Sequence, residues 1–454
     1  MGVWSTINLR DIQNRVRIEA EFYRPKFLAC QKIVESIPHV RLGSTKRKIS
    51  DGTHFTPRYI SSGTRFYSAL NVKEGYFAHE EAFKFISANE HREIHKRCPV
   101  RAGDVLLRKV GAGPRWSCVV PDGLDEFSIF VSVAMIRPAD TIQPEYLSTF
   151  MNCHYGQLQL LRLNKGISQP DLHLEDIGDL IVPVLTPSDQ FAIAELVKDS
   201  QRLRDVSRTL YAAAQELLEA ELELDKLSFL KPVGYLANFS DLETSHRSDA
   251  QHYQPRFKQL IDHISTFPSA RVRDIRSLNR RGLQPIYLRN GDFDIVNSQH
   301  LGPKHIDYEG LEKTSAKSFA AAAEAHIQQD DLLIYTTGAY IGRTNVYLSD
   351  APAMASNHVN IVRLHPGIDA AYMALVFQSI VGQFQTQQHA RGSAQSELYP
   401  SDIDRFVVPL LDADKQKAIG ELVRESLVKQ QESRRLLDQA KTRVEQLIEA
   451  AVQP

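Results

Sequence analysis

Cysteine is scarce in this sequence, and long apolar runs are absent. The 454-residue chain has four cysteines, Cys30, Cys98, Cys118 and Cys153, which all lie in the first half and form no close pair. Their spacing suggests neither a zinc ribbon nor a disulfide framework, so we expect ordinary thiols. The apolar stretches fall far short of the ~20 residues of a membrane-spanning helix, and no basic segment followed by an apolar one opens the sequence. We therefore expect a cytoplasmic protein with no membrane partner.

An excess of charge is also missing, because 54 Lys and Arg residues balance 55 Asp and Glu residues. This balance argues against a chain that coats nucleic acid by bulk charge. Basic residues do gather locally, in the apparent loops 46–48, 108–115 and 271–281. Such a cluster is either solvated surface charge or a contact for an anionic partner, and both interpretations stay open here.

Catalytic motifs are missing as well. Three residues lie between Gly338 and Gly342, and Arg343 follows them, whereas a phosphate loop needs four intervening residues and a lysine. His91 and His95 have helical spacing, but no glutamate directly follows the first histidine, as zinc peptidases require. No methyltransferase tetrapeptide, Gly-x-Ser-x-Gly elbow or dinucleotide-binding fingerprint occurs. We expect no enzymatic activity, no metal and no cofactor.

The sequence does contain an internal repeat with an offset of 226 residues. Segment 166–172 (Gly-Ile-Ser-Gln-Pro-Asp-Leu) matches segment 392–398 (Gly-Ser-Ala-Gln-Ser-Glu-Leu), and the match continues from Ile193 and Val197 to Ile419 and Val423. Further upstream the offset drifts by a few residues, pairing 104–107 with 331–334 and 23–27 with 253–257. This period exceeds the ~20–50 residues of solenoid units, so each copy is expected to be a domain with its connector.

Within each copy the hydrophobic period changes along the chain. Short apolar runs broken by Gly, Pro, Asn and Asp come first, and the runs 104–107, 130–137, 331–335 and 359–364 are typical of strands in a mixed domain. A long helical pattern follows. We predict an α+β protein with two tandem mixed α/β domains at 1–186 and 231–411, each followed by a long helix, at 187–230 and 412–454.

The two helical segments carry apolar residues at helical spacing. In the first, leucines recur every seventh residue, at Leu196, Leu203, Leu210, Leu217 and Leu224. In the second, one face holds Val423, Leu437, Val444 and Leu447. A heptad seam needs a partner helix, and forty-odd residues at a rise of ~1.5 Å span about 60 Å, too long for one small domain to bury. We predict that the helices pack as an antiparallel coiled coil, which gives the two copies pseudo-two-fold symmetry.

The repeated block has a recognisable order: Gly-x-Ser/Ala-Gln-x-x-Leu, then Ile, an apolar strand ending in Pro, and Gln-x-x-Ile opening a long helix. It resembles the specificity (S) subunit of type I restriction-modification enzymes. Segments 49–57, 331–343 and 440–449 resemble that family too, and the resemblance covers almost the whole chain. The second copy departs from it, because it has 279–285 (Asn-Arg-Arg-Gly-Leu-Gln-Pro) where the first has Asp-Gly-Thr-His at 51–54.

The resemblance implies a non-catalytic subunit of a phage-defence restriction system that directs DNA methylation. Its two target recognition domains would each read a short half-site of double-stranded DNA. The helices would set their separation and dock two methyltransferase (M) subunits, with or without restriction (R) motor subunits. Similar scaffolds with unlike loops would give an asymmetric target interrupted by a spacer.

The predicted DNA contacts are polar and basic residues beside glycines in loops, because Arg, Lys, Asn, Gln, Ser and Thr contact phosphates and base edges. In the first copy they are Thr53, His54, Thr56, Arg58, Asn71, Arg108, Lys109 and Arg115. In the second they are Arg280, Arg281, Asn297, Gln299, Thr336, Thr337, Tyr340, Arg343 and Arg391. Each is alternatively an ordinary turn residue of an exposed loop.

Two hypotheses of other classes stay open. One is an S-like DNA-binding adaptor of a different defence assembly, or of a fused nuclease-methyltransferase; neighbouring genes for separate methyltransferase and motor subunits would argue against it. The other is a protein-interaction scaffold whose globular halves bind protein or RNA. Loss of DNA specificity after loop substitutions would argue against the scaffold.

Overall fold

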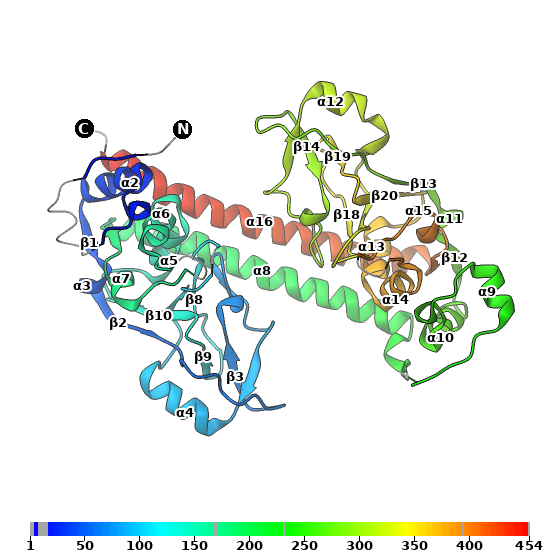
Figure 1. The fold of residues 1–454 in the computed structure, drawn as a ribbon, viewed down its shortest axis with the longest axis horizontal. Helices are drawn as coiled ribbons and strands as arrows, with labels where there is room; N and C mark the ends of the chain where they lie inside the picture. Colours follow the sequence, from blue (N-terminus) through cyan, green and yellow to red (C-terminus); the bar gives the residue numbers. More distant parts are fainter. Residues whose placement is uncertain are drawn as a thin grey trace. The chain divides into compact units, whose positions relative to one another are not determined.

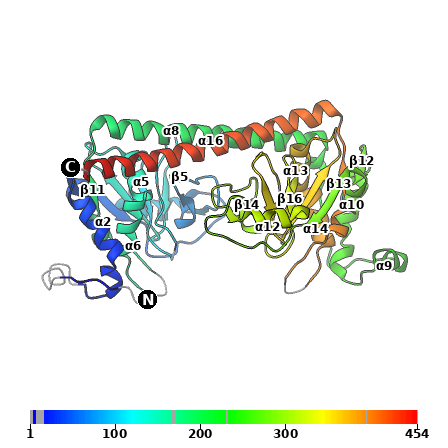
Figure 2. The same ribbon diagram turned by 90° about the horizontal axis from the view of Figure 1, so that it is seen from above.

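The computed structural model describes residues 4–7, 17–111, 113–166, 170–229, 232–392 and 395–452. The chain forms two compact units, unit 1 with Met1–Arg204 and Gln431–Pro454, and unit 2 with Asp205–Gln430. Each combines a mixed α/β domain with parts of two long helices, α8 (Pro187–Glu221) and α16 (Ala413–Val452) (Figure 1). Within each unit the helical segments lie along one side of the domain (Figure 2).

Unit 1 contains two main sheets. The antiparallel sheet has the order β2 (Lys46–Asp51), β10 (Val133–Pro138), β7 (Val105–Arg108) and β8 (Ser117–Val119). The second has the order β6 (Lys84–Ile86), β3 (Thr64–Tyr67) and β9 (Phe127–Ile129), with β3 and β9 parallel. Two strand pairs complete it: β4 (Val72–Lys73) with β5 (Tyr76–Phe77), and β1 (His39–Arg41) with β11 (Ile181–Pro183). Its helices are η1 (Ala20–Tyr23), α2 (Pro25–Glu35), α3 (Leu42–Thr45), η2 (Ala69–Asn71), α4 (Ala88–Arg97), α5 (Pro144–Asn152), α6 (His154–Leu163) and α7 (Leu174–Gly178).

Unit 2 repeats this plan. Its antiparallel sheet has the order β13 (Arg276–Arg281), β20 (Val359–Leu364), β17 (Leu332–Tyr335) and β18 (Thr344–Val346). The second sheet has the order β15 (Glu312–Thr314), β14 (Phe293–Val296), β19 (Ala353–Ala355) and β16 (His326–Ile327). Strand β12 (Ser269–Arg271) pairs with β21 (Val407–Pro409). Its helices are η3 (Leu224–Lys226), α9 (Phe239–Ser245), η4 (Ala250–Tyr253), α10 (Pro255–Ile264), α11 (Val272–Ile275), η5 (Ser298–His300), α12 (Ala316–Ala321), η6 (Ala323–Ala325), α13 (Ala370–Gln378), α14 (Ile380–His389) and α15 (Pro400–Ile403).

Buried polar contacts recur at equivalent places in the two domains. The Tyr146 hydroxyl donates to the Pro183 carbonyl (2.8 Å), as that of Tyr372 does to Pro409 (3.0 Å). Arg137 likewise holds the buried carboxylate of Asp104 through two 2.7 Å hydrogen bonds. In unit 2, Arg363 holds Asp331 at 2.7 and 2.8 Å. The sequence repeat is therefore a repeat of structure, with two β-rich domains of mixed α+β type.

The long helices pack against each other in both units, and the packing is antiparallel. In unit 1 the Ser200 hydroxyl donates to the Ser433 carbonyl (2.8 Å), while Arg443 pairs with Asp189 (3.3 Å). In unit 2, Ser207 bonds Ser426 (3.1 Å) and Lys415 pairs with Glu221 (2.7 Å). In each unit the partner's number falls as the number along α8 rises. The two serine pairs use repeat-equivalent positions, because 200 and 207 become 426 and 433 on adding the offset.

The buried seam of α8 differs from the leucine heptad. Its buried residues are Ile193, Ala194, Val197, Ser200, Ser207, Tyr211, Ala214 and Leu218. Leu196, Leu203, Leu210 and Leu217 are half-buried at the margin of this seam, and Leu196 and Leu217 pack against the cores of unit 1 and unit 2. Leu224 is buried but lies in η3, because α8 ends at Glu221 and not near residue 230 as expected. On α16, Val423 and Val444 are buried, and Leu437 and Leu447 are half-buried against the core.

The seam was misplaced because serine, alanine and tyrosine occupy five of these eight positions, and a pattern search for leucine passes over them. Of the described helices, none carries an apolar stretch sufficient to cross a bilayer.

Candidate nucleic-acid interface

Three loops of unit 1 meet at one end of the antiparallel sheet, and we call them loop cluster 1. Their described residues are 52–63 after β2, 109–111 and 113–116 between β7 and β8, and 165–166 with 170–171 after α6. Backbone hydrogen bonds tie the second loop to the third, from Gly111 N to Pro170 O (3.1 Å) and from Leu172 N to Lys109 O (3.0 Å). An ion pair ties it to the first, because Lys109 Nζ lies 2.9 Å from Asp51 Oδ2.

The Asp51–Lys109 pair is almost fully buried, with side-chain exposures of 3% and 5%. Asp171 lies 3.9 Å from the same ammonium group, while Arg97 pairs with the other oxygen of Asp51. His54 Nε2 also lies 3.5 Å from that oxygen. Burial lowers the pKa of Lys109, and the negative charge of Asp171 opposes this shift. These charges hold the start of the 52–63 loop in place.

Unit 2 forms an equivalent loop cluster 2 from residues 282–292, 336–343 and 391–398. The Gly338 amide donates to the Ser396 carbonyl (3.0 Å), and the Leu398 amide donates to that of Thr336 (2.9 Å). Arg281 closes the cluster from the end of β13. Its guanidinium donates to Glu397 Oε1 (2.7 Å) and to the Leu398 carbonyl (2.8 Å).

The two clusters share their backbone pairing but differ in side-chain chemistry. Asp51 lies opposite Ala134 of β10, and the equivalent register in unit 2 places Arg281 opposite Asn360 of β20. The last residue of the first strand of the sheet thus carries a negative charge in unit 1, where the strand is β2, and a positive charge in unit 2, where it is β13. The salt bridge beside the third loop has its basic and acidic residues at equivalent places in both domains. The pairs are Lys165–Asp176 and Arg391–Asp402, both at 2.7 Å.

Glycine is required where each first loop leaves its strand. A Cβ on Gly52 would lie 1.9 Å from the Ile129 carbonyl oxygen, and one on Gly282 would lie 2.1 Å from that of Ala355. No side chain fits at these distances. The Asp-Gly-Thr-His segment therefore has a structural reason for its glycine, which the second copy retains although it lacks the rest of that segment.

Cluster 2 presents arginine and tyrosine together. The Tyr399 ring has the Arg281 and Arg391 guanidinium carbons 4.8 and 5.7 Å from its centre, and Arg343 lies 3.7 Å from the Tyr340 ring centre. Tyr340 is 55% exposed. Flat aromatic and guanidinium surfaces of this kind can stack on nucleobases, while the cations attract phosphates.

The predicted contact residues divide by exposure. Exposed are His54, Thr56, Arg58, Gln299, Tyr340 and Arg391. Half-buried are Thr53, Arg108, Arg280, Arg281, Asn297, Thr337 and Arg343. Buried are Asn71, Lys109, Arg115 and Thr336. Of the repeated block, Ile167, Ser168, Gln169, Ser393 and Ala394 lie outside the described residues.

The buried candidates form hydrogen bonds that stabilise the loops, and they expose little of their side chains to a partner. Asn71 caps η2, accepting from the Ser68 amide (3.0 Å) and donating to the Ala78 carbonyl (3.0 Å). Arg115 donates to Asn164 Oδ1 (2.9 Å) and the Pro170 carbonyl (3.0 Å) under the third loop. Burial lowers its pKa to about 10. The loop prediction is confirmed for Lys109, Arg115 and Thr336, whereas Asn71 lies in η2, and the sequence could not show the burial of any of them.

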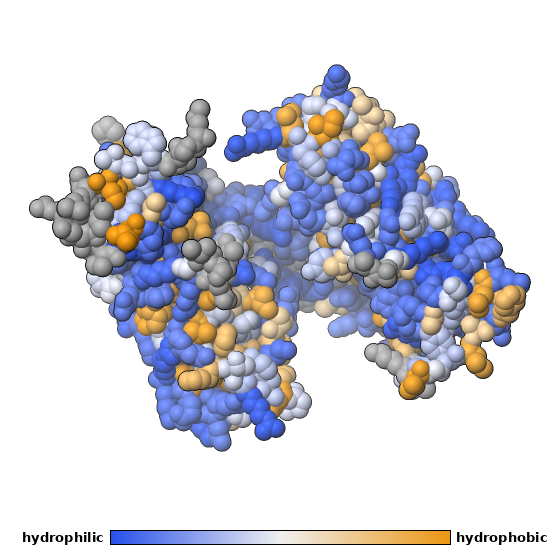
Figure 3. Space-filling view, in the orientation of Figure 1, coloured by the Kyte–Doolittle hydropathy of each residue, from blue (hydrophilic) through white to orange (hydrophobic). Residues whose placement is uncertain are grey.

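An apolar tip on each first loop escaped a search for polar residues. Phe55 and Tyr59 are 83% and 45% exposed in unit 1, and Ile286 and Tyr287 are 70% and 48% exposed in unit 2. The faces visible in Figure 3 are largely hydrophilic, with apolar patches set among polar surface. The available signal was the repeated Pro-x-Tyr-Ile/Leu at 57–60 and 285–288.

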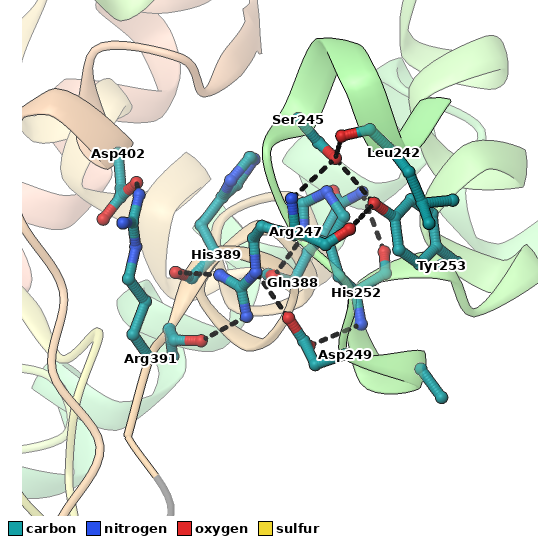
Figure 4. A network of polar contacts seen from close by, with 12 residues as sticks. Leu242, Ser245, Arg247, Asp249, His252, Tyr253, Gln388, His389, Arg391 and Asp402 are labelled. Carbon is teal, nitrogen blue, oxygen red and sulfur yellow. Dashed lines mark hydrogen bonds and ion pairs between the residues drawn. The ribbon is translucent and has the colours of Figure 1, made fainter. Parts of the chain in front are cut away.

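A segment that precedes α10 in unit 2, and α2 in unit 1, clamps the end of the helix that leads into the third loop, another feature missed from the sequence. Figure 4 shows Arg247 donating to the carbonyls of His389 (2.9 Å) and Ala390 (3.0 Å), while Tyr253 donates to the Arg247 carbonyl. In unit 1, Arg17 donates to the carbonyls of Leu163 (3.3 Å) and Asn164 (3.1 Å).

Two histidines beside this clamp are expected to make unit 2 acid-sensitive. The His252 and His389 rings are 5.5 Å apart, and burial lowers both pKa values, that of His389 to about 4. Arg247 and Arg405 lower the pKa of His389 further, whereas Asp402 opposes them. The unfolded imidazole, with a pKa near 6.5, takes up a proton first as the pH falls, so stability present above that pH is lost between about 6.5 and 4.

We expect His389 to account for a loss of ~2 kcal/mol of unfolding free energy between pH 7 and pH 5. The variant His389→Leu, which copies Leu163 of unit 1, should lack this part of the acid sensitivity. Urea unfolding of both proteins at the two pH values measures it. Equal pH dependence would show that His389 is protonated in the folded protein.

Comparisons with known proteins extend this description. No family model matches the chain, and no curated protein matches it either. Among solved structures, a type I restriction-modification S subunit from M. genitalium is similar, with 13% identity, 92% of this chain and 96% of that chain covered, and a TM-score of 0.48. The HsdS subunit from Thermoanaerobacter tengcongensis is similar with 15% identity, 91% and 95% coverage and a TM-score of 0.28. A type IIG restriction endonuclease, BpuSI, matches 42% of this chain and 30% of its own, with 10% identity and a TM-score of 0.30. The two S subunits are thus similar to this chain over more than 90% of its length, at low identity.

Proposed function

We propose that this chain is the DNA-recognition subunit of a type I restriction-modification complex. Loop clusters 1 and 2 each read one half-site of an asymmetric, bipartite target on double-stranded DNA. The long helices set the separation of the half-sites and dock methyltransferase subunits, two in the complete complex, with restriction subunits joining the same assembly. The chain itself carries no catalytic step.

One observation carries this proposal: two domains share a scaffold but have unlike loops at the same place. Gly52 and Gly282 impose the same exit from the sheet, while Asp51 and Arg281, next to them, carry opposite charge. A half-site reader needs a fixed platform and variable side chains, because positioning contacts go to the DNA backbone and base contacts give specificity. Because the loop side chains of the two domains differ, the two domains are expected to read different half-sites.

The margin of α8 supports the docking part of the proposal. Within unit 2, Val206 is 45% exposed, and Leu210, Ala213 and Leu217 are half-buried. These residues follow each other at spacings of three and four, the pattern by which one helix meets another. The outer part of this stripe, Val206 with the half-buried Leu210 and Ala213, is thus available to a partner helix from a methyltransferase subunit.

The deciding experiment is single-molecule methylome sequencing of a host that expresses this chain with its neighbouring methyltransferase, compared with the same host lacking the chain. A split, asymmetric motif that requires the chain supports the proposal. A second arm exchanges loop 336–343 for a glycine-serine loop, which should degrade one half-site and leave the other intact. Absence of any new motif, with a verified complex and an active partner, would instead favour the adaptor or scaffold.

DNA binding by the chain alone should be weak and salt-sensitive, because net charge is near zero and the methyltransferase supplies other contacts. Arg280 is 40% exposed and pairs only loosely with Glu324 (3.3 Å). We expect Arg280→Gln to lower the slope of log affinity against log salt by about one. Arg273→Gln is the matched control, because Arg273 is similarly exposed and pairs with its neighbour Asp274 (3.5 Å). Fluorescence anisotropy at several salt concentrations measures both slopes, and equal slopes would remove Arg280 from the interface.

A further inference from the structure

A short loop in unit 1 reaches from the domain to the long helices. It is the turn of the β4–β5 hairpin, residues 73–76. Gly75 has φ +72°, and a Cβ there would lie 2.8 Å from Leu437 Cδ2 on α16. The Gly75 amide donates to the Ser117 carbonyl (3.0 Å), so the same residue also holds the antiparallel sheet. Both the conformation and the space at this position require glycine.

The residues on either side of Gly75 contact both long helices, Tyr76 on α8 and Glu74 on α16. The Arg204 guanidinium of α8 lies 3.3 Å from the centre of the Tyr76 ring. On α16, Lys441 Nζ lies 2.6 Å from Glu74 Oε1, and both side chains are partly buried, at 24% and 33% exposure. Three consecutive residues, Glu74, Gly75 and Tyr76, thus contact two helices through an ion pair, an apolar contact and a cation–π contact.

In unit 2 the equivalent loop contacts the repeat-equivalent helical position, but through a different type of interaction. The Ala78 amide donates to Asn71 (2.8 Å), as that of Asp307 does to His300 (2.9 Å), so residue 304 takes the place of residue 75. Lys304 Nζ lies 4.7 Å from the centre of the Tyr211 ring on α8. Tyr211 and Leu437 are equivalent in the repeat, since they are 226 residues apart.

We infer that these loops fix the angle between the second sheet of each domain, together with the first loop beside it, and the long helix that they contact. This part of the domain is called the lobe. In unit 1 the hairpin follows β3 through the single turn of η2, so a shift of the hairpin moves the β6-β3-β9 sheet and the 52–63 loop that leads into β3. The inference rests on the proposed function. It adds that spacer length is determined by residues 74–76 and 304 as well as by helix length.

The test compares Gly75→Ala with Gly123→Ala in the full chain. Gly123 has almost the same conformation, φ +79°, but a Cβ there would meet nothing within 4 Å. Both variants carry the strain of a left-handed alanine, and only Gly75→Ala pushes the hairpin from α16. Gly75→Ala combined with Leu437→Ala removes the obstructing methyl groups and should restore the wild-type arrangement.

Two measurements separate position from function. Spin labels at Ser62→Cys and Ala192→Cys, both exposed positions of unit 1, report the distance from the lobe to α8. The native thiols interfere little because burial raises their pKa values, that of Cys98 to about 11 and that of Cys153 to about 12. The second measurement is methylation, with the partner subunit, of duplexes that carry both half-sites and spacers one base pair shorter, equal or longer.

We expect Gly75→Ala to shift or broaden the label distance and to reduce the preference for the native spacer by about tenfold, which corresponds to ~1.4 kcal/mol. Gly123→Ala should leave both unchanged. An unaltered distance in Gly75→Ala would overturn the positioning role, and an altered distance with unchanged spacer preference would overturn its link to specificity. If the wild-type complex methylates no bipartite site, the proposed function fails, and the label distances still decide whether the hairpin fixes the lobe.

Discussion

Removing one heptad from both long helices is expected to shorten the spacer of the recognised target by about three base pairs, because seven residues of helix rise ~10 Å and one base pair ~3.4 Å. The deletion takes out residues 200–206 of α8 and the repeat-equivalent 426–432 of α16. Both helices are continuous through these segments and contribute to both units. Half-site sequences should not change, because loop clusters 1 and 2 keep all their residues.

The deletion is designed to keep the antiparallel seam intact. Ser200 now bonds Ser433, and Ser207 bonds Ser426. After the deletion Ser207 takes the place of Ser200 in α8 and Ser433 takes that of Ser426 in α16, so these two serines can form one pair. Removing the heptad from α8 alone is the contrasting control, because it leaves the two helices unequal in length and should destabilise the protein.

Methylome sequencing measures the result, and duplicating the same two heptads should lengthen the spacer by the same amount. An unchanged spacer in a stable deletion variant would show that the helices do not measure it. Changed half-sites would show that the loops are not independent of the helices.

The repeat and the strand-then-helix plan of each copy could be predicted because they depend on local pattern. Tyr146 and Tyr372 match in sequence and make the same buried hydrogen bond. Helix pairing could also be predicted, since a rod of this length needs a partner. The seam itself could not be placed, because Ser200, Ser207 and Tyr211 fill positions where a hydrophobic pattern expects leucine.

The candidate site could be predicted only at the level of loops. Lys109 was identified as a basic residue near Gly111, but its partner Asp51 is 58 residues away in the sequence. Only the pairing of β2 and β7 with β10 brings these two side chains together. Side-chain exposure could not be predicted from the sequence either. Asn71 and Arg115 are buried, whereas Phe55 is exposed. Side-chain direction depends on tertiary contacts, which a single sequence does not contain.

The Asp51–Lys109 pair is expected to be the most sensitive point of unit 1. Substituting Lys109→Met leaves a buried carboxylate with Arg97 as its remaining close cation, since His54 is a weaker partner at 3.5 Å. The Arg97 side chain is 49% exposed and compensates the buried carboxylate only in part, while the carboxylate cannot recover its hydration. We expect a loss on the order of 3 kcal/mol in the unfolding free energy.

The double variant Asp51→Asn with Lys109→Met should recover most of this loss, because neither buried group is then charged. Lys96→Met is the matched control: Lys96 makes an ion pair with Glu93 that is 70% and 71% exposed, and such pairs contribute ~0–1 kcal/mol. Hydrogen exchange of the β7 amides under native conditions reports the stability of unit 1 separately from unit 2. If Lys109→Met and Lys96→Met cost the same, the pair does not act as a buried anchor.

The same variants should separate the two half-sites. Asp51 begins the turn into the 52–63 loop, and Lys109 begins the loop between β7 and β8, so breaking the pair loosens two of the three loops of cluster 1. Loop cluster 2 uses Arg281 and Glu397 for this purpose and is not altered. With the methyltransferase partner, Lys109→Met should relax discrimination at one half-site and keep it at the other. Equal relaxation at both would mean that the two clusters do not read DNA independently.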